Sequence, residues 1–231
     1  MVELTLEGPR KNALSTEHMH RVVDRLRQAG GAPVLLTGAG GAFSAGLDLE
    51  EVHWLDASGM ERLLRALEEM VSTLFTYPGP TAAAVNGHAI AGGCLLALAC
   101  DYRVAAGDAH IRIGLNEVSL GLEFPPGLLR MVRAVLPPER CAEVLLGSGL
   151  HCPHEAVRLG LVDATASEPL APAREWLTRA ARHPPDAYAA AKRALRGTST
   201  TRPEDGPALQ AILPSWTSPA LKERIAALLR K

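Results

Sequence analysis

The chain has 231 residues, of which 47% are hydrophobic and 21% charged, a balance typical of a soluble globular protein rather than a disordered one. Twenty-four Lys and Arg against 25 Asp and Glu leave a formal net charge of −1, so there is no global positive field and nucleic acid is not an expected partner. The longest uncharged apolar stretch in the middle of the chain, 89–100, is shorter than the roughly 20 residues that a spanning helix needs, so no membrane segment is predicted.

The first half of the chain alternates short apolar runs, which predict strands, with segments of helical periodicity. The predicted strands are 4–6, 33–37, 81–85 and 101–105. The predicted helices are 15–29, with Ser15 or Thr16 as the cap, 60–75 and 94–100. Strands that alternate with helices indicate βαβ-type units and a layered α/β architecture.

After about residue 122 the pattern becomes mostly helical, and Pro and Gly separate the segments. The predicted helices of this part are 127–135, 139–146, 154–159, 171–182, 186–196 and 219–230. We therefore expect two regions, an α/β core over residues 1–165 and a helical C-terminal region over residues 166–231.

The cysteines and histidines form no metal or redox pattern. The four cysteines lack a C-x-x-C spacing, so we expect reduced core residues. Residues 151–154 offer at most three ligands in a tight turn that contains Pro, so no metal site is predicted. The first residues carry Glu3 and Glu7 and no apolar run of a signal peptide, so a cytoplasmic protein is expected. Its 20 Arg against four Lys are typical of a GC-rich bacterial genome.

Two glycine-containing segments, 41–49 (GAFSAGLDL) and 86–96 (NGHAIAGGCLL), each follow a predicted strand and precede an apolar stretch. Glycine lets a backbone turn tightly and approach a ligand closely, and a helix N-terminus presents unpaired N–H groups. Two such ends that face one point would form an oxyanion hole, where each donor is worth about 10²–10³ in rate. Spacing alone leaves open that these glycines only permit close packing. A dinucleotide site is disfavoured because G-x-G-x-x-G is absent.

Three ordered motifs, GAFSAGLDL, VNGHAIAGGCLLALACDYRVA and IGLNEVSLGL, resemble those of the crotonase superfamily, the enoyl-CoA hydratase/isomerase family. The resemblance covers about residues 10–163, with a family-like tail in WTSPALKERIAALL. It implies a crotonase-like spiral of ββα units, a helical C-terminal trimerisation region and an acyl-CoA thioester substrate. It also implies a homotrimer or a dimer of trimers. No separate cofactor is expected, because coenzyme A is part of the substrate.

The resemblance also assigns roles to individual positions. In this family two backbone N–H groups stabilise a thioester enolate, and the matching positions here are Leu47 and Gly92. Further substrate or CoA contacts are expected at five residues: Ala45, Gly46, Asp48, Leu49 and Asn116. For Asp48, a role in capping a helix or fixing a loop is the alternative.

The acids decide which reaction is predicted. A family hydratase uses two Glu residues, but here Leu95 occupies the first position and only the second, Glu117, is present. Adding water requires activation of the water and delivery of a proton, which two carboxylates share. Moving a double bond from position 3 to position 2 requires one base that takes a proton from C2 and returns it at C4. The GLNE string also resembles Δ3,Δ2-enoyl-CoA isomerases, so an isomerase is predicted.

Two alternatives remain open at this point. Glu123 could replace the missing acid, which would favour a hydratase or another thioester reaction, or it is a loop residue or ion-pair partner. A chain with Leu95 could also bind acyl-CoA without catalysis, although Glu117 argues against this. If Glu117 is partly buried, desolvation raises its pKa and suits it to acid and base catalysis near neutral pH.

Overall fold

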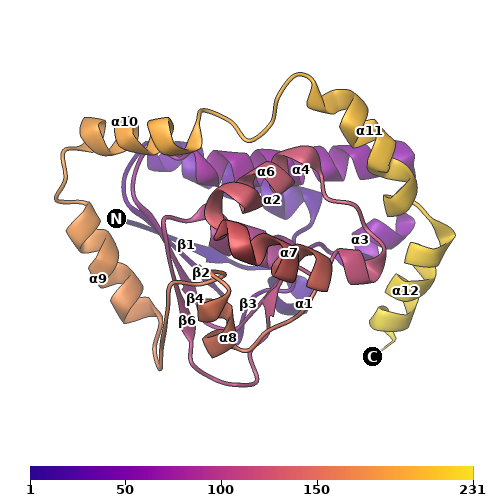
Figure 1. Ribbon diagram of the computed structural model, residues 1–231, viewed down its shortest axis with the longest axis horizontal. Helices are drawn as coiled ribbons and strands as arrows, with labels where there is room; N and C mark the ends of the chain where they lie inside the picture. The colour runs from indigo at the N-terminus through magenta and orange to yellow at the C-terminus, as the bar shows by residue number, and fades with distance from the viewer. Residues whose placement is uncertain (231) are drawn as a thin grey trace.

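Parallel strands form two sheets in the computed structural model, which describes residues 1–230 (Figure 1). The larger sheet has the order β1 (Val2–Leu6), β2 (Val34–Gly38), β4 (Thr81–Val85), β6 (Tyr102–Ala106) and β8 (Ala164–Ala166). The smaller sheet has the order β3 (Ala42–Ser44), β5 (His88–Ile90) and β7 (Ile113–Gly114). Successive ββα units thus contribute one strand to each sheet, and the predicted α/β class is confirmed.

Helices account for most of the remaining chain. In the first half these are α1 (Pro9–Asn12), α2 (Thr16–Ala29), α3 (Leu49–Trp54), α4 (Ala57–Phe75) and α5 (Gly92–Ala99). The short 3₁₀ helix η1 (Val118–Leu120) precedes α6 (Pro126–Val135), α7 (Pro138–Gly147), α8 (Pro153–Arg158), α9 (Leu170–Ala180), α10 (Pro185–Arg196), α11 (Asp205–Trp216) and α12 (Pro219–Leu229). Of the two residues considered as the cap of α2, Ser15 is the one that caps it, because its Oγ accepts the His18 N–H at 3.1 Å.

The central strands are buried on both faces, which explains their uninterrupted apolar sequences. Leu36 belongs to the main core with α2, α4 and α5, whereas its neighbour Leu35 packs with Leu177 of α9 on the opposite face. Consecutive residues of a strand point to opposite faces. Each of β2, β4 and β6 is followed in the chain by a strand of the small sheet, β3, β5 and β7 respectively.

The small sheet, β8 and α11 were not predicted from the sequence. Strands of two or three residues are too short to show a period of two. Helix α11 contains Pro214, and proline normally ends or kinks a helix. The predicted C-terminal region ends at Lys231, which lies outside the described residues.

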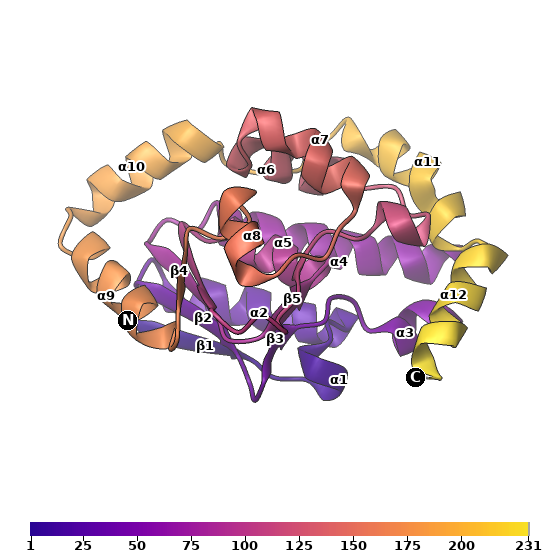
Figure 2. The ribbon, with the colours of Figure 1, turned by 60° about the horizontal axis from the view of Figure 1, so that its bottom comes forward.

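The C-terminal helices divide into two groups. In Figure 2, α9 and α10 lie at one end of the molecule, near β1, and α11 and α12 lie at the other end, near α3. Nowhere in residues 1–230 is a helix both long and apolar enough to cross a bilayer.

A buried ion cluster attaches α10 to the core. Asp101, whose side chain is 9% exposed, pairs with Lys192 at 2.8 Å and with Arg196 at 3.0 Å. It also accepts hydrogen bonds from the Tyr188 hydroxyl and the Thr81 N–H. Burial lowers the pKa of Lys192, and Asp101 opposes that shift. The carboxylate is therefore the compensating charge for two buried cations.

We predict that Asp101→Asn lowers the free energy of unfolding by about 3–5 kcal/mol, because it leaves Lys192 and Arg196 without a buried counter-ion. Glu3→Gln is the matched control, since Glu3 pairs with Arg174 of α9 on the surface and should cost less than about 1 kcal/mol. Urea unfolding of both variants measures the difference. Equal losses would contradict the assigned role of the cluster.

Candidate active site

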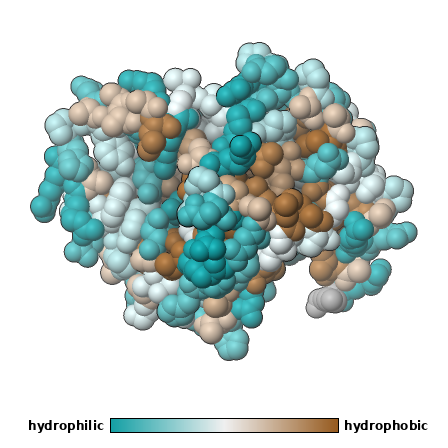
Figure 3. All heavy atoms as spheres, in the orientation of Figure 1, coloured by the Kyte–Doolittle hydropathy of each residue, from teal (hydrophilic) through white to brown (hydrophobic). Residues whose placement is uncertain are grey.

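A cavity of about 280 Å³ lies between the small sheet, α5 and the C-terminal helices. Its lining is almost entirely aliphatic and aromatic. The apolar side chains include Val52, Leu67, Leu95, Leu122, Phe124, Leu128, Trp216, Leu221, Ile225 and Leu228. Figure 3 shows hydrophobic side chains gathered on the face between α6, α7 and the last two helices. The lining of the cavity thus suits an apolar chain.

Glu117 carries the only carboxylate in the lining of this cavity, as far as residues 1–230 are concerned. The residue is 5% exposed, and its Oε2 has no hydrogen-bond partner in the described part of the chain. Desolvation by burial raises its pKa to about 7. The N–H groups of Leu120 and Leu122 both donate to its backbone carbonyl at 3.0 Å. Glu117 is therefore held by its main chain, and its side chain can exchange a proton near neutral pH.

The backbone nitrogens of Leu47 and Gly92 lie near one another, and both residues line the same cavity as Glu117. A Cβ placed on Gly92 would lie 3.7 Å from the Leu47 nitrogen, and one placed on Gly46 would lie 3.3 Å from the Gly92 nitrogen. Gly92 is the first residue of α5, so its N–H has no intrahelical acceptor. Within residues 1–230 neither N–H donates a hydrogen bond to the protein. Two backbone N–H groups without an acceptor among residues 1–230 therefore lie close together in the wall of the cavity.

Positive φ angles shape both donor segments. Gly46 has a φ of 88°, and a Cβ there would lie 2.8 Å from the Ile90 carbonyl oxygen. Ala91 has a φ of 49°, a conformation that is unfavourable for a residue with a Cβ. Strain of this kind persists where the surrounding structure determines the backbone, as it does at many functional sites.

The structure brings together most of the other predicted site residues. Ala45, Leu49 and Asn116 line the cavity, and the Oδ1 of Asn116 is buried without a partner in the described chain. Asp48 does not line it. Its carboxylate caps α3 by accepting the Glu50 N–H at 3.0 Å and pairs with Arg10 at 2.6 Å. The contacts of Asp48 thus match the alternative role considered from the sequence, that of capping a helix and fixing a loop, rather than a substrate contact.

Glu123 lies apart from the other predicted residues. Its side chain is exposed and is not part of the cavity lining, and its backbone contacts Ser215 and Trp216 of α11. Leu95, at the position of the missing acid, is 1% exposed and lines the cavity. The cavity therefore presents a single acid, with an apolar side chain where a second would stand.

Sequence reasoning missed the contribution of the C-terminal helices. Trp216 of α11 and three residues of α12 line the cavity: Leu221, Ile225 and Leu228. The spacing of these three at i, i+4 and i+7 is a detectable apolar stripe. The stripe predicts a buried helix face, but it carries no information about which cavity the face covers.

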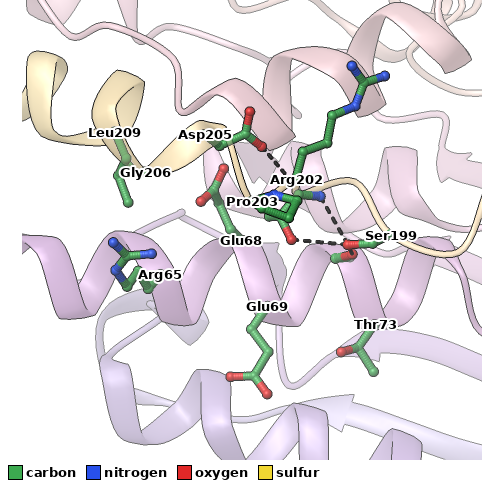
Figure 4. A pocket seen from close by; sticks show the side chains of 12 residues that line it. Arg65, Glu68, Glu69, Thr73, Ser199, Arg202, Pro203, Asp205, Gly206 and Leu209 are labelled. Atoms are coloured by element: carbon green, nitrogen blue, oxygen red, sulfur yellow. Dashed lines mark hydrogen bonds between the residues drawn. The ribbon is translucent and has the colours of Figure 1, made fainter.

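A second hollow, of about 670 Å³, lies between α4 and the segment before α11 (Figure 4). Its lining is polar and contains none of the predicted site residues. Asp205 pairs with Arg130 and accepts the Arg202 N–H at 2.7 Å. Glu68 accepts the Gly127 N–H at 2.9 Å, at the start of α6. These groups join chain segments to one another, so we do not assign the chemistry to this hollow. Across residues 1–230, no cluster of three or more His, Cys, Asp or Glu side chains could hold a metal ion.

Comparisons with known proteins agree with this site. Residues 1–215 match a family model described as enoyl-CoA hydratase/isomerase. A Thermus thermophilus protein that bears the provisional name of an enoyl-CoA hydratase is 37% identical over 234 residues, which cover 96% of this chain and 91% of that protein. Rat mitochondrial enoyl-CoA delta isomerase 1 is 34% identical over 172 residues, 71% of this chain and 59% of that protein. The crystal structure of human mitochondrial Δ3,Δ2-enoyl-CoA isomerase matches with a TM-score of 0.91 and 26% identity, covering 99% of this chain and 92% of that chain. The crotonase-like fold expected from the sequence is thus confirmed, and trimerisation stays a prediction.

The raised pKa of Glu117 predicts a pH-dependent stability difference. Its ordinary value is 4.5 and its folded value is about 7, so between these pH values the folded chain binds more protons than the unfolded chain. The free energy of unfolding therefore falls as pH rises through this window. Glu117→Gln removes this loss. Above pH 7 the free energy of unfolding of the variant should therefore be up to about 3 kcal/mol greater than that of the unaltered protein.

At pH 4.5 the free energies of unfolding of the two proteins should differ little, because Glu117 is then protonated in the folded state. Urea unfolding at pH 4.5 and pH 8 measures both differences. An equal difference in the free energy of unfolding at the two pH values would mean that Glu117 does not titrate as a desolvated carboxyl.

Proposed function

Since the chain belongs to the enoyl-CoA hydratase/isomerase family, we propose that it is a Δ3,Δ2-enoyl-CoA isomerase with Glu117 as its single acid and base. One observation carries the choice of reaction. The cavity contains one desolvated carboxylate with a pKa of about 7, and Leu95 stands where a hydratase would carry a second acid. The substrate is a 3-enoyl-CoA thioester, whose acyl chain occupies the apolar cavity.

In the proposed reaction the Glu117 carboxylate removes a proton from C2 of the substrate. The electron pair of the broken C–H bond moves into the thioester, and the negative charge of the dienolate develops on the carbonyl oxygen. In this mechanism the N–H groups of Leu47 and Gly92 donate to that oxygen. Protonated Glu117 then delivers the same proton to C4, so the double bond ends between C2 and C3 and no atom is gained or lost.

The surroundings of Glu117 support both halves of this transfer. A pKa near 7 places the carboxyl close to equal populations of acid and base at neutral pH, which is the best compromise for a group that must do both. The apolar lining excludes water, which disfavours hydration of the conjugated product. A low dielectric also strengthens the interaction of the two N–H donors with the developing charge.

Hydration is the second candidate, because the relative from Thermus thermophilus carries the name of a hydratase. Hydration here requires a group other than Glu117 to handle the second proton. Glu123 is the acid considered from the sequence, and its exposed side chain would have to turn into the cavity on substrate binding.

We predict that the purified protein converts a 3-enoyl-CoA to the 2-enoyl-CoA and does not hydrate a 2-enoyl-CoA, as measured by chromatography and mass. Glu117→Gln should abolish turnover but leave acyl-CoA binding within a few-fold, because the change is nearly isosteric. Glu123→Gln is the control and should leave isomerisation unchanged.

Each result leads to a definite conclusion. Hydration that is lost in Glu123→Gln would establish the second candidate. Binding of acyl-CoA without turnover of either substrate would mean that the protein is not an isomerase. Loss of folding in Glu117→Gln would make that residue structural.

We predict that Gly92→Pro lowers kcat about 10²–10³-fold relative to Gly92→Ala. Both substitutions add the same Cβ, which would meet only the Leu14 side chain closer than 3.4 Å. Proline is accepted at the first position of a helix, so Gly92→Pro removes the donor while α5 can persist. Steady-state kinetics on a 3-enoyl-CoA measures the ratio. Equal rates in the two variants would place the second donor elsewhere.

A further inference from the structure

A left-handed turn at residues 10–12 precedes the segment that carries Leu47. Arg10, Lys11 and Asn12 have φ angles of 47°, 62° and 59°. Only two other non-glycine residues in the described chain have a positive φ. Asn tolerates this region, whereas Arg and Lys rarely adopt it. Three such residues in succession persist only where other contacts hold them.

The side chain of Asn12 supplies those contacts. Asn12 is 4% exposed, and its Nδ2 donates to the carbonyls of Ala42 at 2.8 Å and Ala39 at 2.9 Å. The Phe43 carbonyl lies at 3.3 Å from the same nitrogen, and the Gly8 N–H donates to Oδ1 at 3.4 Å. One buried amide thus joins the turn to the connection between β2 and β3.

The backbone after the turn continues this attachment. The Ala45 N–H donates to the Lys11 carbonyl at 3.0 Å. Leu14 accepts from the Asp48 N–H at 3.1 Å and donates to the Gly46 carbonyl at 2.8 Å. The segment 45–48 is therefore held on both sides of Leu47 by the stretch that follows the left-handed turn.

Ser44 completes the arrangement from the side of β3. Its buried Oγ donates to the Asn12 carbonyl at 2.9 Å and accepts the Gly46 N–H at 3.2 Å. The N–H groups of residues 45, 46 and 48 all donate hydrogen bonds inside the protein, whereas that of Leu47 has no acceptor among residues 1–230. The network thus fixes residues 45, 46 and 48 and leaves the Leu47 N–H without an acceptor in the described chain.

We propose that Asn12 is a positioning residue that fixes the Leu47 N–H in the direction of the reacting oxygen. This inference rests on the proposed function, in which that N–H is one of the two donors. Among residues 1–230, none of the hydrogen-bond partners of the Asn12 side chain lines the cavity. It acts through residues 39–43 and Ser44, and the left-handed turn is the geometry by which residues 11–14 reach segment 45–48.

The test compares three variants. Asn12→Gly keeps a residue that accepts a positive φ and removes the amide, and Ser44→Ala removes the hydroxyl between Asn12 and Gly46. Tyr77→Phe is the matched control. Tyr77 is itself buried, and its hydroxyl makes two partly buried hydrogen bonds, from the Gly31 N–H at 2.9 Å and to the Ala32 carbonyl at 2.7 Å, beyond the other end of β2. Each variant removes side-chain hydrogen bonds of a buried residue, but only Asn12→Gly and Ser44→Ala loosen the Leu47 segment.

We expect Asn12→Gly to lower kcat for a 3-enoyl-CoA about 10²-fold, the effect of an approximately 1 Å misplacement, while KM and the binding of the saturated thioester of the same chain length change only a few-fold. Ser44→Ala should lower kcat in the same direction, and Tyr77→Phe should not change it. If Asn12→Gly does not fold, the kcat of Ser44→Ala tests the proposal. A kcat in the altered proteins that matches Tyr77→Phe would overturn the proposal.

Amide hydrogen exchange supplies a readout that does not depend on the reaction. In the folded Asn12→Gly and Ser44→Ala proteins, peptides that cover residues 44–48 should exchange faster, while β2 and α5 keep their protection. If the unaltered protein turns over no 3-enoyl-CoA, the proposed function fails and this measurement still tests the positioning. Unchanged exchange in segment 44–48 would overturn the inference.

Discussion

At the small sheet, β3 and the segment after it approach the end of β5 and the start of α5 so closely that only glycine fits between the backbones. A Cβ on Gly93 would lie 2.3 Å from the Ser44 carbonyl oxygen, and one on Gly46 would lie 2.8 Å from that of Ile90. No side chain other than hydrogen fits at either position. Because β3 and the start of α5 touch through their backbones, the N–H groups of Leu47 and Gly92 come to adjoin one another. The close packing of these backbones is therefore what brings the two N–H groups together.

Burial of charge is handled in two opposite ways in this molecule. Asp101 is surrounded by Lys192, Arg196 and the Tyr188 hydroxyl, so its charge has partners and the cluster holds α10 to the core. Within the described part of the chain Glu117 has no such partner for Oε2, and desolvation raises its pKa to about 7. An unpaired buried carboxylate costs stability whenever it is ionised. That cost is consistent with a carboxyl whose task is to gain and lose a proton. It is not the cost expected of a charge with a structural role.

The C-terminal helices are coupled to the cavity through bonds to the loop after Glu117. The Trp216 indole donates to the Glu123 carbonyl at 2.9 Å, and Arg224 donates to the Leu120 carbonyl at 2.8 Å. Leu221 and Ile225 of α12 meanwhile fill the apolar wall. The region that the sequence sets apart as helical is thus part of the enclosure of the cavity, since Trp216 and the apolar face of α12 line it.

The sequence alone determined the alternation of strands and helices, the apolar stripe of α4, the two glycine segments and the isolated acid Glu117. These features are local, because a period or a glycine next to an apolar run is visible within a few residues. The exposure of Glu123, the capping of α3 by Asp48, and the covering of the cavity by α11 and α12 became visible in three dimensions alone. The same is true of the small sheet, whose strands are too short to show a period, and of the hydrogen bonds from Asn12 to residues 39–43. Each of these depends on which distant segments meet, and that is set by packing and by the burial of polar groups rather than by any local pattern.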